Sequence, residues 1–327
     1  MRGTFLGRRA LPLSLCLLAL LGAPLLITDS YDRHLLILSL VFAVAAANWD
    51  VSLGVAGLFN FAHMAFFGIG VYAAAILSKV AGIDPWLAIL LAGLCATLAA
   101  ILVSLPVIRL RGIYVVLVTF AFGQLVQQVV LSQSNITGGS LGMVLLPPLR
   151  IGALNFARDQ KLAYCYTAIA LLAVAVLLLE WLMRSPLGAA IRAVRDDEDY
   201  AAARGISAAR TQLLAIVASA PMTGIAGGFY AIYEGVASTD IFGFGTLSLV
   251  LSMVLLGGAG TIYGPIVAAF ALTFFSEALV GLGLWRFLII PAAMVLVLVA
   301  FPGGLASVAH LLPRGDRLVL RRRTLRP

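Results

Sequence analysis

The segment 161–210 reads KLAYCYTAIALLAVAVLLLEWLMRSPLGAAIRAVRDDEDYAAARGISAAR, and it joins a long apolar run to the most charged stretch of the chain. The run 161–183 is long enough to cross the ~30 Å hydrocarbon core of a bilayer as a helix. Residues 184–210 hold five arginines and four acidic residues in a chain that is only 11% charged. This order predicts a membrane helix that ends in a water-exposed connection, which is most simply a docking surface for a soluble partner.

The composition of the whole chain indicates a membrane protein. Hydrophobic residues make up 62% of its 327 residues and the mean hydropathy is +1.07, whereas soluble domains are about half apolar and a quarter charged. The net charge of +8 does not point to nucleic acid, because the arginines cluster at the ends of apolar runs and at the two termini. We therefore expect a lipid bilayer around the chain and no nucleic-acid partner.

Ten apolar stretches are long enough to cross the bilayer as helices. They lie at about 11–28, 34–52, 55–78, 86–107, 112–132, 161–183, 210–234, 246–264, 265–281 and 285–302. Each stretch is continuously apolar and does not alternate as barrel strands do. The sequence thus predicts an all-α, polytopic integral membrane protein with about ten transmembrane helices, and a loop over 132–160. Glycines near 52–55 and a Gly-Pro pair at 264–265 leave broken or re-entrant helices open at those two places.

The distribution of basic residues selects one orientation. With the N-terminus in the cytoplasm, sixteen of the 22 lysines and arginines lie inside, as the positive-inside rule requires. Both termini and the segment 184–210 are then cytoplasmic. We divide the chain into 1–34, with a cytoplasmic N-terminus and a first transmembrane helix, a membrane domain over 35–305, and a basic cytoplasmic tail over 306–327. A cleaved signal peptide at the start is the alternative.

The predicted spans lack the groups that drive ion-coupled transport or catalysis. Charged side chains that map within a turn or two of helix ends, where water can solvate them, are Asp50, Glu180, Glu234, Glu277 and Arg286. His63 lies deeper, where a packing hydrogen bond is a more common role than a proton relay. The chain has no phosphate-binding G-x-x-x-x-G-K-[ST] motif. We expect no catalytic residue, no metal site and no bound cofactor, so that any ATP is bound by partner subunits.

Two glycine-rich stretches, 54–70 and 243–264, combine small residues with polar ones. Close helix packing explains much of this pattern. A flexible backbone beside polar side chains also suits a transient route for a small solute. The candidate translocation residues are Gly57, Asn60, Phe61, His63, Phe67, Gly257, Gly258 and Gly260.

Four segments together resemble one family. They are GLFNFAHMAFFGIGVYAAAIL (57–77), RLRGIYVVLVTFAFGQLVQQVV (109–130) with TGGSLGM (137–143), SPLGAAIRAVRDDEDYAAARGI (185–206) and FGFGTLSLVLSMVLLGGAGTIYGPIVAAF (242–270). Over about 35–305 the chain is similar to the membrane permease subunits of bacterial high-affinity branched-chain amino acid ABC importers, particularly the longer of their two paired permeases. The motif Asn60-Phe-Ala-His63 is closer to the shorter one.

The resemblance implies the ABC importer permease fold and a transport subunit of the bacterial inner membrane, not an enzyme. It also implies a heterodimer with a second permease, two cytoplasmic ATPase subunits that bind ATP, and a periplasmic substrate-binding protein. Branched-chain amino acids are the implied substrate. Permeases for urea, amides or other small organic solutes are close alternatives, and a gradient-driven secondary transporter is a more distant one.

The resemblance implies that the segment 185–206 is the coupling segment, which in this family enters a groove on the ATPase. We expect an interfacial helix over Ala189–Ala203 that ends at Gly205. The residues assigned to ATPase coupling are Pro186, Gly188, Arg192, Arg195, Asp196, Asp197, Glu198, Ala202 and Gly205.

Overall fold

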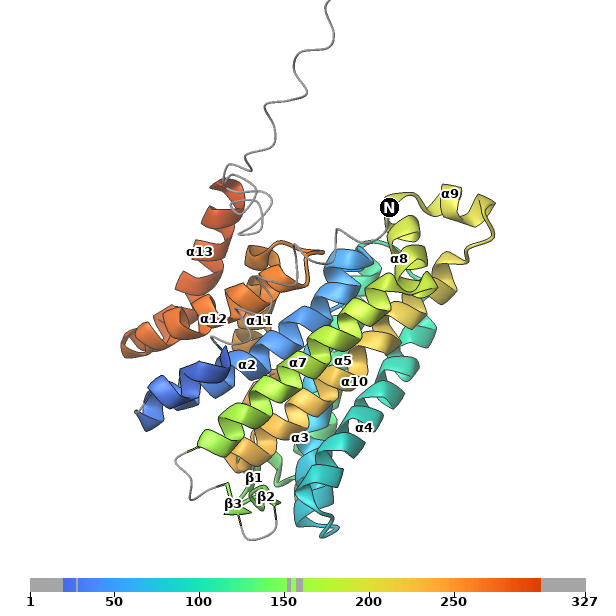
Figure 1. Ribbon diagram of the computed structural model, residues 1–327. Helices are drawn as coiled ribbons and strands as arrows, with labels where there is room; N and C mark the ends of the chain where they lie inside the picture. The colour runs from blue at the N-terminus through green and yellow to red at the C-terminus, as the bar shows by residue number, and fades with distance from the viewer. Residues whose placement is uncertain (1–19, 28, 152–153, 157–160, 301–327) are drawn as a thin grey trace, which may run out of the picture.

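The computed structural model describes residues 20–300 except 28, 152–153 and 157–160. The described residues form a bundle of helices with small two-stranded sheets at one end (Figure 1). Of the first predicted span, 11–28, only residues 20–27 are described, and 20–26 are helical. The basic tail 306–327 lies outside the described residues.

Five helices are long and apolar enough to cross a membrane. They are α2 (Ser30–Asp50), α4 (Pro85–Val107), α5 (Ile113–Ser132), α7 (Leu162–Arg184) and α10 (Ala208–Glu234). Shorter apolar helices accompany them, namely α3 (His63–Lys79), α11 (Phe244–Gly257), α12 (Tyr263–Ala278) and α13 (Arg286–Ala300). The predicted helical, polytopic architecture is confirmed, while the count of ten spans stays a prediction.

The connection 132–160, which we predicted to be a loop, contains regular structure. It holds α6 (Ser134–Thr137), the 3-10 turn η2 (Gly139–Leu141), β1 (Met143–Val144), β2 (Arg150–Ile151) and β3 (Leu154–Asn155). Strand β1 pairs antiparallel with β4 (Val236–Ala237), and β2 pairs with β3. Gly138, Gly139 and Gly142 all have positive φ, which permits the tight reversals between these short elements. The pairing of β1 with β4 ties this connection to the end of α10.

Helix α2 lies in the middle of the bundle, against α7, α10 and α12 (Figure 1). Its most apolar window is 94% buried, whereas that of α5 is only 17% buried. The burial of α2 agrees with its composition, because a helix that is apolar on all sides is buried. Helix α5, whose most apolar window is mostly exposed, lies at the periphery of the described helices.

Helices α3, α4 and α10 cross with their backbones in contact. A Cβ atom added at Gly70 in α3 would lie 2.1 Å from the Gly224 carbonyl oxygen in α10. One added at Gly93 in α4 would lie 2.9 Å from the Pro221 carbonyl oxygen. Small residues are what allow membrane helices to approach this closely. These three helices form one tightly packed unit.

The two glycine-rich stretches break their helices at places that differ from the predicted ones. Helix α2 runs on into a π-helical turn, η1 (Val51–Val55), and α3 begins only at His63, so the predicted helix 55–78 loses its first part. The predicted helix 246–264 ends at Gly257, and the break covers residues 258–262. The Gly264-Pro265 pair lies in the first turn of α12, where proline's missing N–H costs nothing.

The chain after α10 re-enters the bundle through a 3-10 turn, η3 (Thr239–Phe242), which precedes α11. Another 3-10 segment, η4 (Val280–Trp285), joins α12 to α13 and contains Gly283 at positive φ. Helix α11 packs against both α12 and α13, and α11 and α12 also pack against α2 (Figure 1).

Candidate functional site

The charged segment folds into two short helices at the end of the bundle opposite β1, β2 and β3 (Figure 1). They are α8 (Pro186–Asp196) and α9 (Glu198–Ala203). The single helix predicted over Ala189–Ala203 is wrong, because Asp197 has an extended backbone with φ −160°. The Asp197 carboxylate accepts a hydrogen bond from the Tyr200 N–H at 2.8 Å, which favours a new helix start over continuation.

The turn from α7 into α8 is held tightly. Ser185 ends α7 and caps α8, since its Oγ accepts from the Gly188 N–H at 3.3 Å. Pro186 occupies the first turn of α8, where proline is favoured. A Cβ at Gly188 would lie 2.4 Å from the Leu182 carbonyl oxygen. Only glycine fits here, so the direction of α8 is set by α7.

One face of α8 packs on the membrane bundle. Ile191 and Val194 are buried, and Ile191 packs in a cluster with Val55, Ala56 and Ala215. The Arg192 guanidinium donates to the Met183 carbonyl oxygen at 3.0 Å, which holds α8 against the end of α7. Helix α8 is therefore packed against η1 and α10.

The other face of the segment is exposed. Its exposed residues from the coupling set are Pro186, Arg192, Arg195, Asp196, Asp197, Ala202 and Gly205, while Glu198 is half-buried. Glu198 forms an ion pair of 2.9 Å with Arg111, just before α5. These side chains offer a charged surface at one end of the bundle.

Gly205 ends α9 as predicted. Its φ is +81°, its N–H donates to the Ala202 carbonyl at 2.9 Å, and the Ile206 N–H donates to the Ala201 carbonyl at 3.0 Å. This pair of bonds is a Schellman motif, which requires the left-handed conformation that glycine adopts without strain.

Asp50, at the last turn of α2, is fully buried with 0% exposure. Its Oδ1 accepts from the Gly260 N–H at 2.7 Å, and its Oδ2 accepts from the Ile262 N–H at 3.0 Å. The prediction that water solvates Asp50 at a helix end is therefore wrong, because backbone donors replace the water. The carboxylate fixes the broken segment 258–262 to the end of α2.

Arg195 of α8 reaches both helix breaks. A Cβ at Gly57 would lie 3.3 Å from the Arg195 Cγ, and one at Gly260 would lie 3.0 Å from its Nη1. Its guanidinium also acts electrostatically on the Asp50 carboxylate. The structure thus joins Arg195, assigned to coupling, with Gly57 and Gly260, assigned to translocation. We call this group, with Asp50, the break junction.

Gly54 has no side chain and therefore allows the backbone at the end of α2 to lie close to the break 258–262. A Cβ at Gly54 would lie 2.0 Å from the Asp50 Oδ1 and 2.1 Å from the Gly260 nitrogen. Gly257 and Gly264 make a similar backbone contact between α11 and α12, with a Cβ at Gly257 only 2.3 Å from the Gly264 carbonyl carbon. Gly258 has φ +97° and reverses the chain between them.

The remaining translocation candidates hold the irregular segment 56–62 in place. The Trp49 indole N–H donates to the Asn60 carbonyl at 2.7 Å, and the His63 ring stacks on Trp49 with centroids 6.1 Å apart. The Phe61 N–H donates to the Thr119 hydroxyl of α5 at 3.0 Å. Asn60, His63 and Phe67 are buried and Phe61 is half-buried. Their place along a substrate path stays a prediction.

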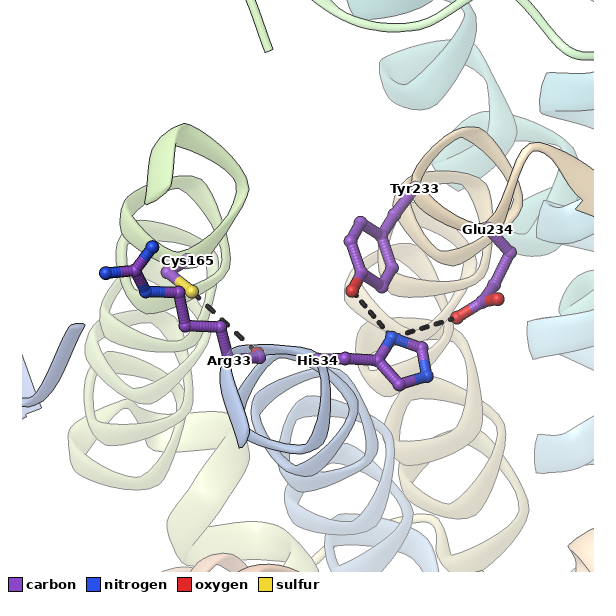
Figure 2. Close-up of polar contacts among 5 residues, drawn as sticks. All are labelled: Arg33, His34, Cys165, Tyr233 and Glu234. Atoms are coloured by element: carbon purple, nitrogen blue, oxygen red, sulfur yellow. Dashed lines mark hydrogen bonds and ion pairs between the residues drawn. The ribbon is translucent and has the colours of Figure 1, made fainter. Parts of the chain in front are cut away.

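A second polar cluster lies at the other end of α2 (Figure 2). His34 Nδ1 is 2.6 Å from the Tyr233 hydroxyl and 3.9 Å from Glu234 Oε1, and the Cys165 thiol donates to the Arg33 carbonyl at 3.9 Å. These contacts tie α2 to α7 and α10. Sequence reasoning noted Glu234 but missed its partner, because the two residues are 200 positions apart and no local pattern pairs them.

The chain matches known proteins over most of its length. A family model described as the permease component of branched-chain amino acid transport systems matches residues 33–300. The high-affinity branched-chain amino acid transport system permease proteins LivM of Escherichia coli (strain K12) and of Salmonella typhimurium are each 30% identical to it over 294 residues. Each alignment covers 84% of this chain and 69% of the relative. No solved structure matches. The chain therefore belongs to the family of branched-chain amino acid transport system permease components.

Proposed function

We propose that this chain is the membrane-spanning permease subunit of an ATP-driven ABC importer that carries branched-chain amino acids across the bacterial inner membrane. Its partners are a second permease in a heterodimer, two cytoplasmic ATPase subunits and a periplasmic substrate-binding protein. The family and the multi-pass helical fold support the transport role. The positive-inside distribution of arginines supports cytoplasmic termini and a cytoplasmic α8–α9 segment.

The observation that carries the coupling role is the contact of Arg195 with Gly57 and Gly260. Helix α8 has one exposed face for an ATPase and one buried face on the bundle. A displacement of α8 by the ATPase subunits therefore moves Arg195 directly against the two helix breaks. Breaks are the points where helices bend at low cost, since their backbone lacks a complete hydrogen-bond ladder.

Substrate then passes between the two permeases along the glycine-rich segments 55–78 and 246–264, which are the segments interrupted by these breaks. Rocking of α7 and α10, the helices that flank α8 and α9, gates the passage. The binding protein supplies affinity, so the membrane chain needs few charged groups inside its spans.

The test is uptake into proteoliposomes that contain the complete complex. The complex consists of this chain and the proteins encoded by the neighbouring reading frames, purified together. We expect leucine, isoleucine and valine to enter only with ATP and the binding protein, and to enter equally well with an uncoupler present. Uptake that survives loss of the ATPase subunits and collapses with an uncoupler would indicate a secondary transporter. Uptake of urea or an amide without branched-chain amino acids would assign the alternative substrate.

A further inference from the structure

A cavity of about 550 Å³ opens between α2, α5, α11, α12 and α13. Its volume falls within the ~300–1,000 Å³ of small-molecule sites. Its polar lining residues are Gln127, Asp240, Thr246, Ser248, Thr273, Ser276 and Glu277. None of them belongs to the break junction or to the translocation candidates taken from the sequence.

The cavity carries acidic groups and no basic side chain among the described residues that line it. Asp240 accepts a hydrogen bond from the Ser238 hydroxyl at 2.9 Å. Glu277 accepts a hydrogen bond from the Tyr31 hydroxyl through Oε1, and its second oxygen remains an acceptor. Two carboxylates without a lining cation favour a positively charged ligand, and the primary ammonium of an amino acid is one.

Thr273 points to a ligand independently of this charge. The residue lines the cavity, is only 6% exposed, and its Oγ1 has no hydrogen-bond partner among the described residues. An unpaired buried hydroxyl is unfavourable, and a helical threonine could have bonded to its own backbone. A polar ligand in the cavity would satisfy it.

The cavity also offers hydrogen-bond donors for the carboxylate of an amino acid zwitterion. Gly243 and Gly245 line the cavity at the start of α11, a helix of 14 residues whose first turn has no side-chain cap. The first N–H groups of a helix lack intrahelical acceptors and attract a carboxylate. Apolar lining residues, which are Leu38, Phe42, Leu249 and Ile290, suit an alkyl side chain.

We propose that this cavity is a substrate subsite in which Asp240, Glu277 and Thr273 bind the ammonium of an aliphatic amino acid while the N-terminus of α11 receives its carboxylate. The proposal deepens the proposed function and rests on it. It places the substrate beside α5, whose most apolar window is only 17% buried, and beside α13, which lies at the edge of the bundle (Figure 1), where a second permease can complete the site.

The experiment measures leucine uptake by the reconstituted full complex, with saturating binding protein. We expect Asp240→Asn and Glu277→Gln each to lower the uptake rate about tenfold, because a hydrogen bond to a charged group is lost. Basal ATP hydrolysis should stay at the wild-type rate. Asp84→Asn, which removes a carboxylate at the start of α4 and outside the cavity, should keep normal uptake.

Thr273→Val provides a second readout that a purely structural role would not produce. It removes an unpaired buried hydroxyl, so the thermal stability of the complex should stay equal or rise, while uptake falls. The matched control is Thr223→Val, since the buried Thr223 hydroxyl already donates to the Ser219 carbonyl at 3.0 Å and lies outside the cavity.

Two results overturn the subsite. One is wild-type uptake by both carboxylate variants, and the other is wild-type uptake by Thr273→Val. Neither is confused with failure of the proposed function, which would appear as absence of ATP-dependent leucine uptake in the unmutated complex.

Discussion

At the scale of single residues, Asp50 and Arg195 decide how the ends of the membrane helices meet the coupling segment. The Asp50 carboxylate satisfies two backbone donors of the break 258–262. The Arg195 stem lies over Gly57 and its guanidinium lies next to Gly260. These contacts join three parts of the chain that are far apart in sequence.

Replacing Arg195 should uncouple ATP hydrolysis from uptake. Arg195→Ala keeps the buried face of α8 but removes the side chain that touches both breaks. We expect leucine uptake per ATP hydrolysed to fall about tenfold in proteoliposomes, with the complex still assembled. The matched control is Arg204→Ala in the same segment, whose guanidinium donates to the Tyr200 hydroxyl at 2.8 Å and lies over the Tyr200 ring. Normal coupling in the Arg195 variant would contradict the role of the break junction.

Replacing Asp50 should destabilise the break. Asp50→Ala leaves the half-buried Gly260 N–H and the buried Ile262 N–H without acceptors, and a buried unsatisfied donor costs about 1–3 kcal/mol. Asp50→Asn retains one acceptor oxygen and should lose less. Thermal unfolding of the purified complex should therefore rank wild type above Asn, and Asn above Ala. Equal midpoints for all three proteins would rule out this bonding pattern.

At the scale of elements, the proposed coupling requires that the short turn between α7 and α8 holds the two helices in a fixed relative direction. Ser185, Pro186 and Gly188 set the direction of α8 with respect to α7. The buried Ile191 then seats α8 on η1 and α10. Under the proposed function, a displacement of α8 would therefore also displace η1 and α10.

Gly188→Ala tests this rigidity. The added Cβ would meet backbone atoms of Leu182 and Met183, which cannot move aside as a side chain can, so α8 must shift. We expect strongly reduced coupling of ATP hydrolysis to uptake. Gly235→Asn, at the end of α10 and outside the coupling residues, is the comparison, since asparagine tolerates the left-handed conformation and nothing lies within 4 Å of a Cβ there. If the Gly188 variant couples normally, the turn does not transmit the movement.

At the scale of the whole molecule, the bundle has two chemically different ends. One carries α8 and α9, and the other carries the strands β1, β2 and β3 (Figure 1). The proposed orientation puts the first end in the cytoplasm and the second in the periplasm.

Cysteine labelling in intact cells tests this orientation. With the natural cysteines replaced, a cysteine at Ala202, in α9, should react only after the cells are made permeable. A cysteine at Leu141, in η2 and 88% exposed, should react with a membrane-impermeant reagent from outside. The opposite pattern would invert the topology and remove α8 from reach of a cytoplasmic ATPase.

The sequence by itself determined the class of molecule, because burial in lipid demands long apolar helices and leaves charge for their ends. The sequence also predicted that Gly205 ends a helix, because such an end needs a residue in the left-handed conformation and glycine adopts it without strain. The break at Asp197 was not predicted, because Asp196, Asp197 and Asp199 are all suitable helix caps and only the structure shows that the Asp197 side chain accepts from the Tyr200 N–H.

Only the tertiary structure decided the partners of Asp50 and Arg195, and the place of Thr273 in the cavity lining. Each is defined by contacts with segments from tens to hundreds of residues away, and no periodicity encodes such distances. Asp50 near a helix end looks solvated until the glycines at 54 and 260 are seen to bring a second backbone against it. At Asp50, packing between distant segments replaces water with peptide N–H groups. The local sequence cannot predict whether water or protein groups will donate hydrogen bonds to a carboxylate.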